Sequence, residues 1–127
     1  MDTRSKILTA AALRTGPPLP RPLLVVTGCF DMLRAWHARE LQAARERAGA
    51  AALLVAVLPA PAAVLGQRAR VELVAALRVV DYVVSIDDRD ANTLIDSLQP
   101  AAVVRLEAAD ARLTRQLIED VQRRQIR

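Results

Sequence analysis

Residues 23–31 read Leu-Leu-Val-Val-Thr-Gly-Cys-Phe-Asp, an apolar run that ends in a glycine-bearing turn and an acidic residue. Four consecutive aliphatic side chains predict a strand covered on both faces, as in a parallel sheet between two layers of helices. Gly28 suits a tight turn from such a strand into a helix. Backbone N–H groups at the start of that helix would favour an anion. The run therefore predicts an α/β domain with a candidate ligand loop at residues 27–31.

The rest of the chain alternates between helical and strand patterns around this run. Helices are expected over residues 3–13, 31–48, 62–78 and 91–98, with a last one marked by Leu113, Leu117, Ile118 and Val121. Further strands are expected over residues 52–58, 79–86 and 101–106, and the proline-rich residues 17–22 form a linker after the first helix. Strands that alternate with helices imply right-handed crossovers and a mostly parallel sheet. Ligands in such sheets bind beyond the carboxyl ends of the strands, which again indicates residues 27–31.

Length and composition indicate one globular domain spanning residues 1–127. Hydrophobic residues make up 53% of the chain and charged residues 25%, so enough apolar surface is available to offset the entropy of ordering. Phe30, Trp36 and Tyr82 are the only aromatic rings, which argues against recognition of single-stranded nucleic acid by base stacking. The single cysteine, Cys29, excludes an internal disulfide and a metal site built from several cysteines.

The formal charge of +4 comes almost wholly from arginine, because Lys6 is the only lysine. These arginines are scattered among acidic residues, which favours solvated helix faces over a nucleic-acid or membrane interface. An arginine-mediated nucleic-acid binder is kept as a third hypothesis, and it predicts salt-sensitive retention on DNA or RNA. No segment approaches the ~18 apolar residues of a membrane span, and the first residues lack a signal-peptide core, so a cytoplasmic protein is expected.

Residues 25–37, Val-Val-Thr-Gly-Cys-Phe-Asp-Met-Leu-Arg-Ala-Trp-His, resemble the signature of the nucleotidyltransferase (cytidylyltransferase-like) superfamily, roughly V-x-x-G-x-F-D-x-x-H-x-G-H. The Gly-Cys-Phe-Asp form is similar to that of the adenylyltransferase domain of bacterial heptose-phosphate nucleotidyltransferases. Residues 75–84 also resemble that family, and the likeness extends over residues 5–107. It implies a Rossmann-like three-layer α/β/α fold. A four-stranded parallel sheet in the order 3-2-1-4 is expected, because this sequence shows no counterpart of the family's fifth strand.

The resemblance also implies a site for a nucleoside triphosphate, ATP or CTP with Mg²⁺. The residues themselves predict no metal site, because Asp87 and Asp88 are typical of a polar turn and not of paired metal ligands. Nucleotidyl transfer requires a loop that holds an anionic chain and neutralises charge developing on the departing pyrophosphate. Two residues, His37 and Arg34, are expected to be catalytic. The residues expected to bind the nucleotide are Thr27, Gly28, Cys29, Phe30, Asp31, Trp36, His37 and Arg70.

Two positions of the signature are replaced. Arg34 stands at the first histidine position and Trp36 at the glycine position, whereas His37 matches the second histidine. Arginine can still bind phosphate, but an indole in place of a hydrogen is expected to obstruct the pocket. Residues 58–60 are apolar where the family has a polar element. After Ala108 the chain passes almost directly into a helix, without the family's fifth strand and Ser/Thr-rich phosphate-binding motif.

Several of these residues also have a purely structural interpretation. Cys29 is typical of a small buried side chain, Asp31 of a helix N-cap, and His37 of a packed, hydrogen-bonded histidine. Arg34 and Arg70 could instead form ion pairs with nearby carboxylates. The residue types alone do not decide between these roles and ligand binding.

The sequence thus supports two hypotheses for function. The first is a degenerate nucleotidyltransferase-like domain, weakly active or inactive, that acts as a binding or assembly module. The alternative is an active enzyme that transfers AMP or CMP to a sugar phosphate or polyol phosphate, with His37, Arg34 and Arg70 on the triphosphate. A homo-oligomer or a protein partner at the sheet edge is expected, because an edge strand needs cover or a partner.

Overall fold

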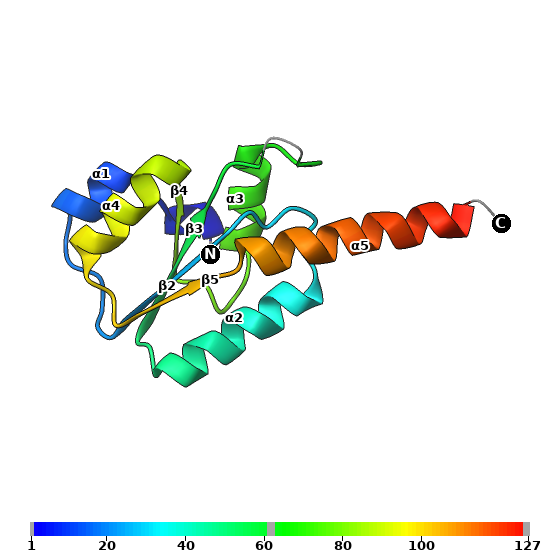
Figure 1. Cartoon of the computed structure of the whole chain (residues 1–127). Helices are drawn as coiled ribbons and strands as arrows, with labels where there is room; N and C mark the ends of the chain where they lie inside the picture. Colours follow the sequence, from blue (N-terminus) through cyan, green and yellow to red (C-terminus); the bar gives the residue numbers. More distant parts are fainter. Residues whose placement is uncertain (1, 61–62, 126–127) are drawn as a thin grey trace.

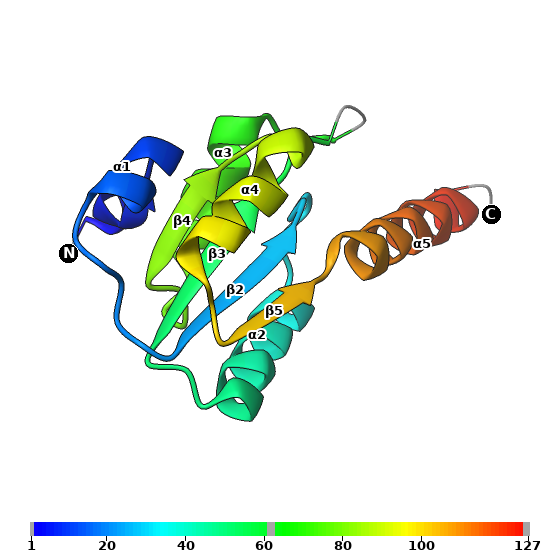
Figure 2. The same ribbon diagram turned by 60° about the vertical axis from the view of Figure 1, so that its left-hand side comes forward.

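The computed structural model describes residues 2–60 and 63–125. A parallel sheet lies between helices on both of its faces (Figures 1 and 2). Its strands are β1 (Ile7–Leu8), β2 (Leu23–Gly28), β3 (Ala52–Val57), β4 (Tyr82–Ser85) and β5 (Ala102–Arg105). The helices are the short 3-10 helix η1 (Thr3–Lys6), α1 (Ala10–Thr15), α2 (Ala35–Ala48), α3 (Gln67–Ala75), α4 (Asp88–Leu98) and α5 (Glu107–Gln125). The expected three-layer α/β/α architecture is confirmed.

The expectation of four strands is wrong, because the sheet has five in the order β1-β4-β3-β2-β5. The four expected strands are β2 to β5, and their mutual order is the one that the family resemblance implied. The additional strand, β1, pairs in parallel with β4 through Ile7 and Leu8. It lies within the segment that was expected to be one helix over residues 3–13. Backbone pairing with the otherwise open edge of β4 decides the conformation of these two residues, and a local pattern cannot reveal such a partner.

The core is built on β2 and β3, in which every residue is buried. Their side chains alternate between the two faces of the sheet. Leu24 and Val26 pack into the apolar cluster that includes residues of α2 and α3, whereas Leu23 and Val25 pack into the cluster that includes residues of α1 and α4. This double coverage explains why both strands read as continuous apolar runs.

The loop between β2 and α2 delays the start of the helix. Phe30 and Met32 both have a φ of 54°, in the left-handed region that interrupts a right-handed helix. As a result α2 begins at Ala35, with Arg34 as its N-cap, rather than at Asp31. The interpretation of Asp31 as the N-cap is therefore wrong.

The other boundaries differ less from those expected. β4 spans Tyr82–Ser85 and is shorter than the strand expected over residues 79–86. α4 begins at Asp88, earlier than the helix expected over residues 91–98. The third expected helix is observed as Gln67–Ala75, and its expected first residue, Ala62, lies outside the described residues.

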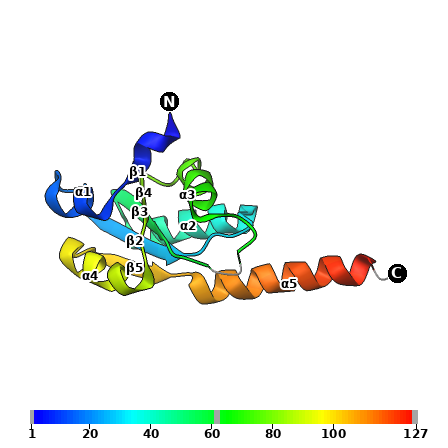
Figure 3. The same cartoon turned by 90° about the horizontal axis from the view of Figure 1, so that it is seen from above.

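After β5 the chain enters α5 directly, and α5 extends away from the rest of the domain (Figures 1 and 3). Asp110, in its first turns, is the one buried residue of the 19 in this helix. β5 forms one edge of the sheet, and within the described residues no further strand pairs with its outer side. None of the helices described here combines the length and apolar character needed to cross a membrane.

Candidate functional site

The loop between β2 and α2 lies at the carboxyl end of β2, at the point where the strand order reverses. β3 pairs with one side of β2 and β5 with the other. This is the position at which open α/β sheets bind ligands, as the sequence predicted. The first turns of α5 follow β5 and reach the same loop, so the site combines residues from both ends of the domain.

His37 lies on the first turn of α2 and is completely buried. Its Nδ1 accepts the backbone N–H of Arg34 at 3.0 Å, and its Nε2 lies 2.7 Å from Oδ1 of Asp110. Because Nδ1 accepts a hydrogen bond, the ring proton is on Nε2 and is donated to the carboxylate. Both nitrogens of the imidazole are therefore engaged by the chain itself.

Two carboxylates of α5 accept hydrogen bonds from the end of β2 and from the loop that follows it. Oδ2 of Asp110 accepts the backbone N–H of Phe30 at 2.6 Å. Oε2 of Glu107 accepts the hydroxyl of Thr27 at 2.7 Å, and Thr27 is fully buried. Hydrogen bonds of this kind to an ionised acceptor are among the stronger ones in proteins. The side chains of α5 thus satisfy two donors that the sequence analysis expected to face a nucleotide.

Glu107 and Asp110 are the residues that the sequence reasoning missed. Their spacing of three places both carboxylates on one face of the first turn of a helix. That helix follows a strand whose carboxyl end lies at the same edge of the sheet as Thr27. This spacing was the available signal, but its meaning depended on knowing that β5 pairs with β2.

Arg70, on α3, is 2% exposed and donates to the main chain. Its Nη1 donates to the carbonyl oxygens of Cys29 at 2.6 Å and Leu58 at 2.8 Å. Its Nε donates to the carbonyl oxygen of Leu65 at 3.2 Å. The expected alternative, an ion pair with a neighbouring carboxylate, is not the arrangement found among the described residues. The guanidinium holds together the loops that follow β2 and β3.

Asp31 also joins these two loops, because its carboxylate belongs to the loop after β2 and accepts hydrogen bonds from the loop after β3. Its carboxylate accepts the backbone N–H groups of Val64 at 2.8 Å and Leu65 at 3.1 Å. It is 8% exposed and links the β2–α2 loop to the segment before α3. Both expected ligand residues, Asp31 and Arg70, therefore have structural partners in this conformation.

The two replaced positions of the signature differ in their surroundings. Nε and Nη2 of Arg34 are buried, and neither has a hydrogen-bond partner among the described residues. Trp36 packs edge-on against the imidazole of His37, with ring centroids 5.0 Å apart. The ring over Gly28 is that of Phe30, because a Cβ on Gly28 would lie 2.7 Å from its Cε2. Gly28 is needed for this close approach whether or not a ligand binds.

A groove of about 460 Å³ separates the loops after β2 and β3 from α5. Small and apolar residues such as Pro59, Ala60 and Ala63 contribute to one side. The charged residues that line it are Asp31, Asp110, Glu119 and Arg115, an excess of carboxylates over guanidinium groups. An excess of negative charge disfavours a triphosphate in this groove.

Cys29 lines the groove and is partly buried. Burial raises the pKa of its thiol, and the negative charge of Asp110 raises it further. A thiol in these surroundings is a poor nucleophile near neutral pH. In the described part of the chain, no three His, Cys, Asp or Glu side chains come together to form a site for a metal ion.

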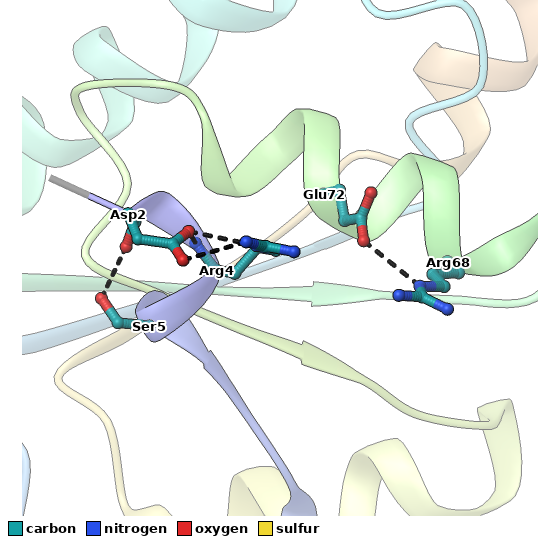
Figure 4. Close-up of polar contacts among 5 residues, drawn as sticks. All are labelled: Asp2, Arg4, Ser5, Arg68 and Glu72. Atoms are coloured by element: carbon teal, nitrogen blue, oxygen red, sulfur yellow. Dashed lines mark hydrogen bonds and ion pairs between the residues drawn. The ribbon is translucent and has the colours of Figure 1, made fainter.

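Arginines on the surface make local contacts with acidic side chains. Nε of Arg4 lies 3.2 Å from Oδ1 of Asp2, and Nε of Arg68 lies 3.2 Å from Oε1 of Glu72. Figure 4 shows both pairs. These two exposed pairs are of the kind expected for solvated helix surfaces, and such pairs contribute little to stability. Arg45 differs: its Nη1 is part-buried, lies 2.8 Å from Oδ2 of Asp81 and also donates to the carbonyl oxygen of Val79.

Comparison with known proteins shows the family of this chain. The family model described as cytidylyltransferase-like matches residues 25–125. The chain belongs to this family. Bifunctional protein HldE of Geobacter sulfurreducens is 34% identical over 93 residues, which are 65% of this chain and 18% of that protein. Bifunctional protein HldE of Geotalea uraniireducens is 33% identical over 106 residues, 76% of this chain and 21% of that protein.

These matches confirm the superfamily and the closeness to the HldE-type adenylyltransferase domain that the signature indicated. The chain spans about a fifth of the length of these curated relatives. A solved structure, the lipopolysaccharide core biosynthesis protein from Thermoplasma volcanium, has the same fold, with a TM-score of 0.58 and 20% identity. The alignment covers 64% of this chain and 70% of that protein.

Proposed function

We propose that this chain is a degenerate nucleotidyltransferase-like domain that does not transfer a nucleotidyl group and that acts as a binding or assembly module. The observation that carries the proposal is the state of His37. It is the one histidine kept from the signature, and both of its ring nitrogens are engaged inside the protein. A buried imidazole with no remaining donor cannot stabilise charge on a transferring phosphate.

The carboxylates of α5 strengthen this proposal. A phosphate bound in the family's manner would have to replace Asp110 on the N–H of Phe30 and on the imidazole of His37. The displaced carboxylate would then face the phosphate. Two like charges about 4 Å apart repel by about 4 kcal/mol at an effective dielectric of about 20. Triphosphate binding would therefore cost both the existing hydrogen bonds and this repulsion.

Arg34 favours the alternative function. Two of its guanidinium nitrogens are buried without a partner in the described residues, and such a cation is costly unless an acceptor satisfies it. An anion would be a suitable acceptor. In this second candidate function the domain binds ATP or CTP with Mg²⁺ and transfers AMP or CMP to a sugar phosphate or polyol phosphate, with Arg34 on the triphosphate.

Calorimetry and a pyrophosphate assay separate the two. The purified chain is titrated with ATP or CTP in the presence of Mg²⁺, and pyrophosphate release is measured with a sugar phosphate added. The proposal expects no pyrophosphate release above the rate without protein. Micromolar binding together with pyrophosphate release overturns it, and loss of both in Arg34→Met would assign them to this loop. Binding without release supports a domain that keeps a ligand but has lost the reaction.

A further inference from the structure

The groove between α5 and the loops after β2 and β3 has apolar walls. Its volume of about 460 Å³ is within the range of sites that bind small molecules. Pro59, Ala60 and Ala63 contribute from the loop after β3, and Ala111 and Ile118 contribute from α5. Ile118 is 39% exposed although its side chain is large and aliphatic. A ligand with an apolar body would cover these side chains and remove their surface from water.

Two buried carboxylates of the groove are already hydrogen-bonded within the protein. Both oxygens of Asp31 accept backbone N–H groups from the segment before α3. The oxygens of Asp110 accept hydrogen bonds from the N–H of Phe30 and from the imidazole of His37. These donors are neutral groups, so they satisfy the oxygens but leave the negative charge of each carboxylate in place. The inner part of the groove is therefore negative and mostly apolar.

Glu119 is the carboxylate of the groove that is free to contact a ligand. Both Glu119 and Arg115 line the groove and are exposed. Neither side chain forms an ion pair with any residue that the structure describes. The described lining residues thus include three carboxylates and one guanidinium group. Positive charge on a ligand would compensate this excess.

The thiol of Cys29 lies in the same groove and is affected by the same charges. Burial raises its pKa, and Asp110 raises the pKa further. Arg70 lowers the pKa, but by less than Asp110 raises it, and Glu107 acts in the same direction as Asp110. The nearby charges of the protein therefore disfavour a negative group at this position. The same electrostatic potential attracts a cation.

We propose that the groove binds a small amphipathic cation, a molecule with an apolar body that carries one ammonium group. The apolar body lies between the loop after β3 and the side chains of Ala111 and Ile118. The ammonium group contacts the carboxylate of Glu119, and the buried charges of Asp31 and Asp110 add to the attraction. The inference rests on the proposed function as a binding module and names the class of its ligand.

Charge distinguishes this ligand class from neutral and anionic molecules of the same shape. A neutral molecule would bury the same apolar area but gain no attraction from the carboxylates. An anionic molecule would bury that area against repulsion from three negative groups. Specificity is a difference of affinities, so a set of ligands that share one apolar body measures it directly.

Calorimetry with phenylbutylamine, phenylbutanol and phenylbutanoate tests the proposal. The amine is expected to bind more tightly than the carboxylate by about tenfold or more, with the alcohol between them. A higher salt concentration should reduce the difference between the amine and the alcohol, because salt screens the charges. Binding of the carboxylate as tightly as the amine, or no binding of any of the three, overturns the proposal.

The variant Glu119→Gln tests the contact of the ammonium group. It is expected to weaken binding of the amine by about threefold, as for an exposed ion pair, and to leave binding of the alcohol unchanged. Asp96→Asn is the matched control, because it removes one exposed carboxylate on α4, outside the groove. Equal effects of the two variants on the amine would mean that only the net charge of the chain matters, which overturns the contact.

The variant Ala111→Phe tests the location of the apolar body. A phenyl group at this position fills part of the groove and is expected to weaken binding of all three probes. Ala11→Phe, at an exposed alanine of α1, is the control and should change none of them. Circular dichroism shows whether both variants are folded, and Glu119→Gln gives an independent result if Ala111→Phe is not. Unchanged binding in a folded Ala111→Phe variant overturns the location.

These outcomes are independent of the test for nucleotidyl transfer. A chain that binds the amine through Glu119 and releases no pyrophosphate supports both proposals. Pyrophosphate release by a chain that binds the amine in this way would overturn the proposed function and leave the cation site in place. A chain that is inert in the pyrophosphate assay and binds none of the three probes would overturn the cation site alone.

Discussion

Oδ1 of Asp110, on α5, lies 2.7 Å from Nε2 of His37, on α2, and both side chains are buried. The contact joins two residues 73 positions apart in the sequence. It converts the histidine kept from the signature into a packing element and makes the last helix part of the loop that follows β2. The stability of the fold and the proposed loss of nucleotidyl transfer therefore depend on the same pair of side chains.

Replacement of Asp110 tests this pair. In Asp110→Ala the N–H of Phe30 and the Nε2–H of His37 lose their acceptor, and we expect the free energy of unfolding to fall by about 3 kcal/mol or more. Urea denaturation measures it. Glu119→Ala, at an exposed position of the same helix, is the control and should change stability by no more than about 0.5 kcal/mol. Equal effects of the two substitutions would show that the buried contact is not important for stability.

Arg70 should contribute as much to the stability of the fold as a hydrophobic core residue does. Arg70→Met keeps the apolar stem but leaves the carbonyl oxygens of Cys29, Leu58 and Leu65 without their donor, so we expect a loss of about 3 kcal/mol. Arg68→Met removes an exposed arginine two residues earlier, with an expected effect below about 0.5 kcal/mol. Thermal unfolding of both variants provides the comparison. An unchanged melting temperature for Arg70→Met would argue that this arginine is kept for a ligand.

Restoring the signature should not restore the reaction. The double variant Arg34→His/Trp36→Gly carries the family's residues at both replaced positions, but His37 stays bonded to Asp110. We therefore expect no pyrophosphate release from ATP or CTP with Mg²⁺ and a sugar phosphate. Circular dichroism confirms that the variant is folded. Release of pyrophosphate by this variant would mean that the substitutions in the loop, and not the α5 carboxylates, limit activity.

Cys29 should titrate above the ordinary range of a thiol, because burial and then Asp110 raise its pKa. The neutral thiol is favoured in the folded state, so its contribution to stability is fully present below the unfolded pKa and is lost as pH rises through the folded pKa. The rate of alkylation by iodoacetamide should reach its midpoint at higher pH in the native protein than in urea. Asp110→Asn should lower the native midpoint. Coincident midpoints in the native and urea-unfolded protein would contradict the prediction.

Glycine should be favoured at two helix ends, so Gly49→Ala and Gln99→Gly should change stability in opposite directions. Gly49 follows α2 with a φ of 58°, and Gln99 follows α4 with a φ of 48°, both in the left-handed region. Gly49→Ala should cost about 1 kcal/mol, although a Cβ at Gly49 would meet nothing within 4 Å. Gln99→Gly should stabilise the chain by up to about 1 kcal/mol, because an L side chain is disfavoured there. Changes of the same sign in the two variants would exclude this backbone explanation.

Most of the sheet could be predicted because its central strands are unambiguous in sequence. β2 and β3 are covered on both faces, and their continuous apolar runs follow directly from that burial. β1 could not be predicted, since a two-residue strand has no periodicity and depends on the open edge of β4. The start of α2 was missed for a related reason. The left-handed conformations of Phe30 and Met32 are imposed by the loop and are unusual for such residues.

The position of the candidate loop could be predicted from sequence, but the hydrogen-bond partners of its side chains could not. Residues 27–31 carry the turn and the glycine that place the loop at the end of β2, and these are local properties of the chain. The partners of His37 were not accessible in this way, because Asp110 reaches it only when β5 pairs with β2 and α5 follows.

The layered α/β architecture, the family and the position of the loop could be predicted from sequence alone. Burial of a strand on both faces and the need for a tight turn both leave a pattern in neighbouring residues. Tertiary structure decided which side chains of the protein contact the loop. Donors expected to face an anion are instead satisfied by carboxylates from a helix about 80 residues later in the chain. Contacts between distant residues depend on how the strands are ordered in space, and local patterns of side chains do not specify that order.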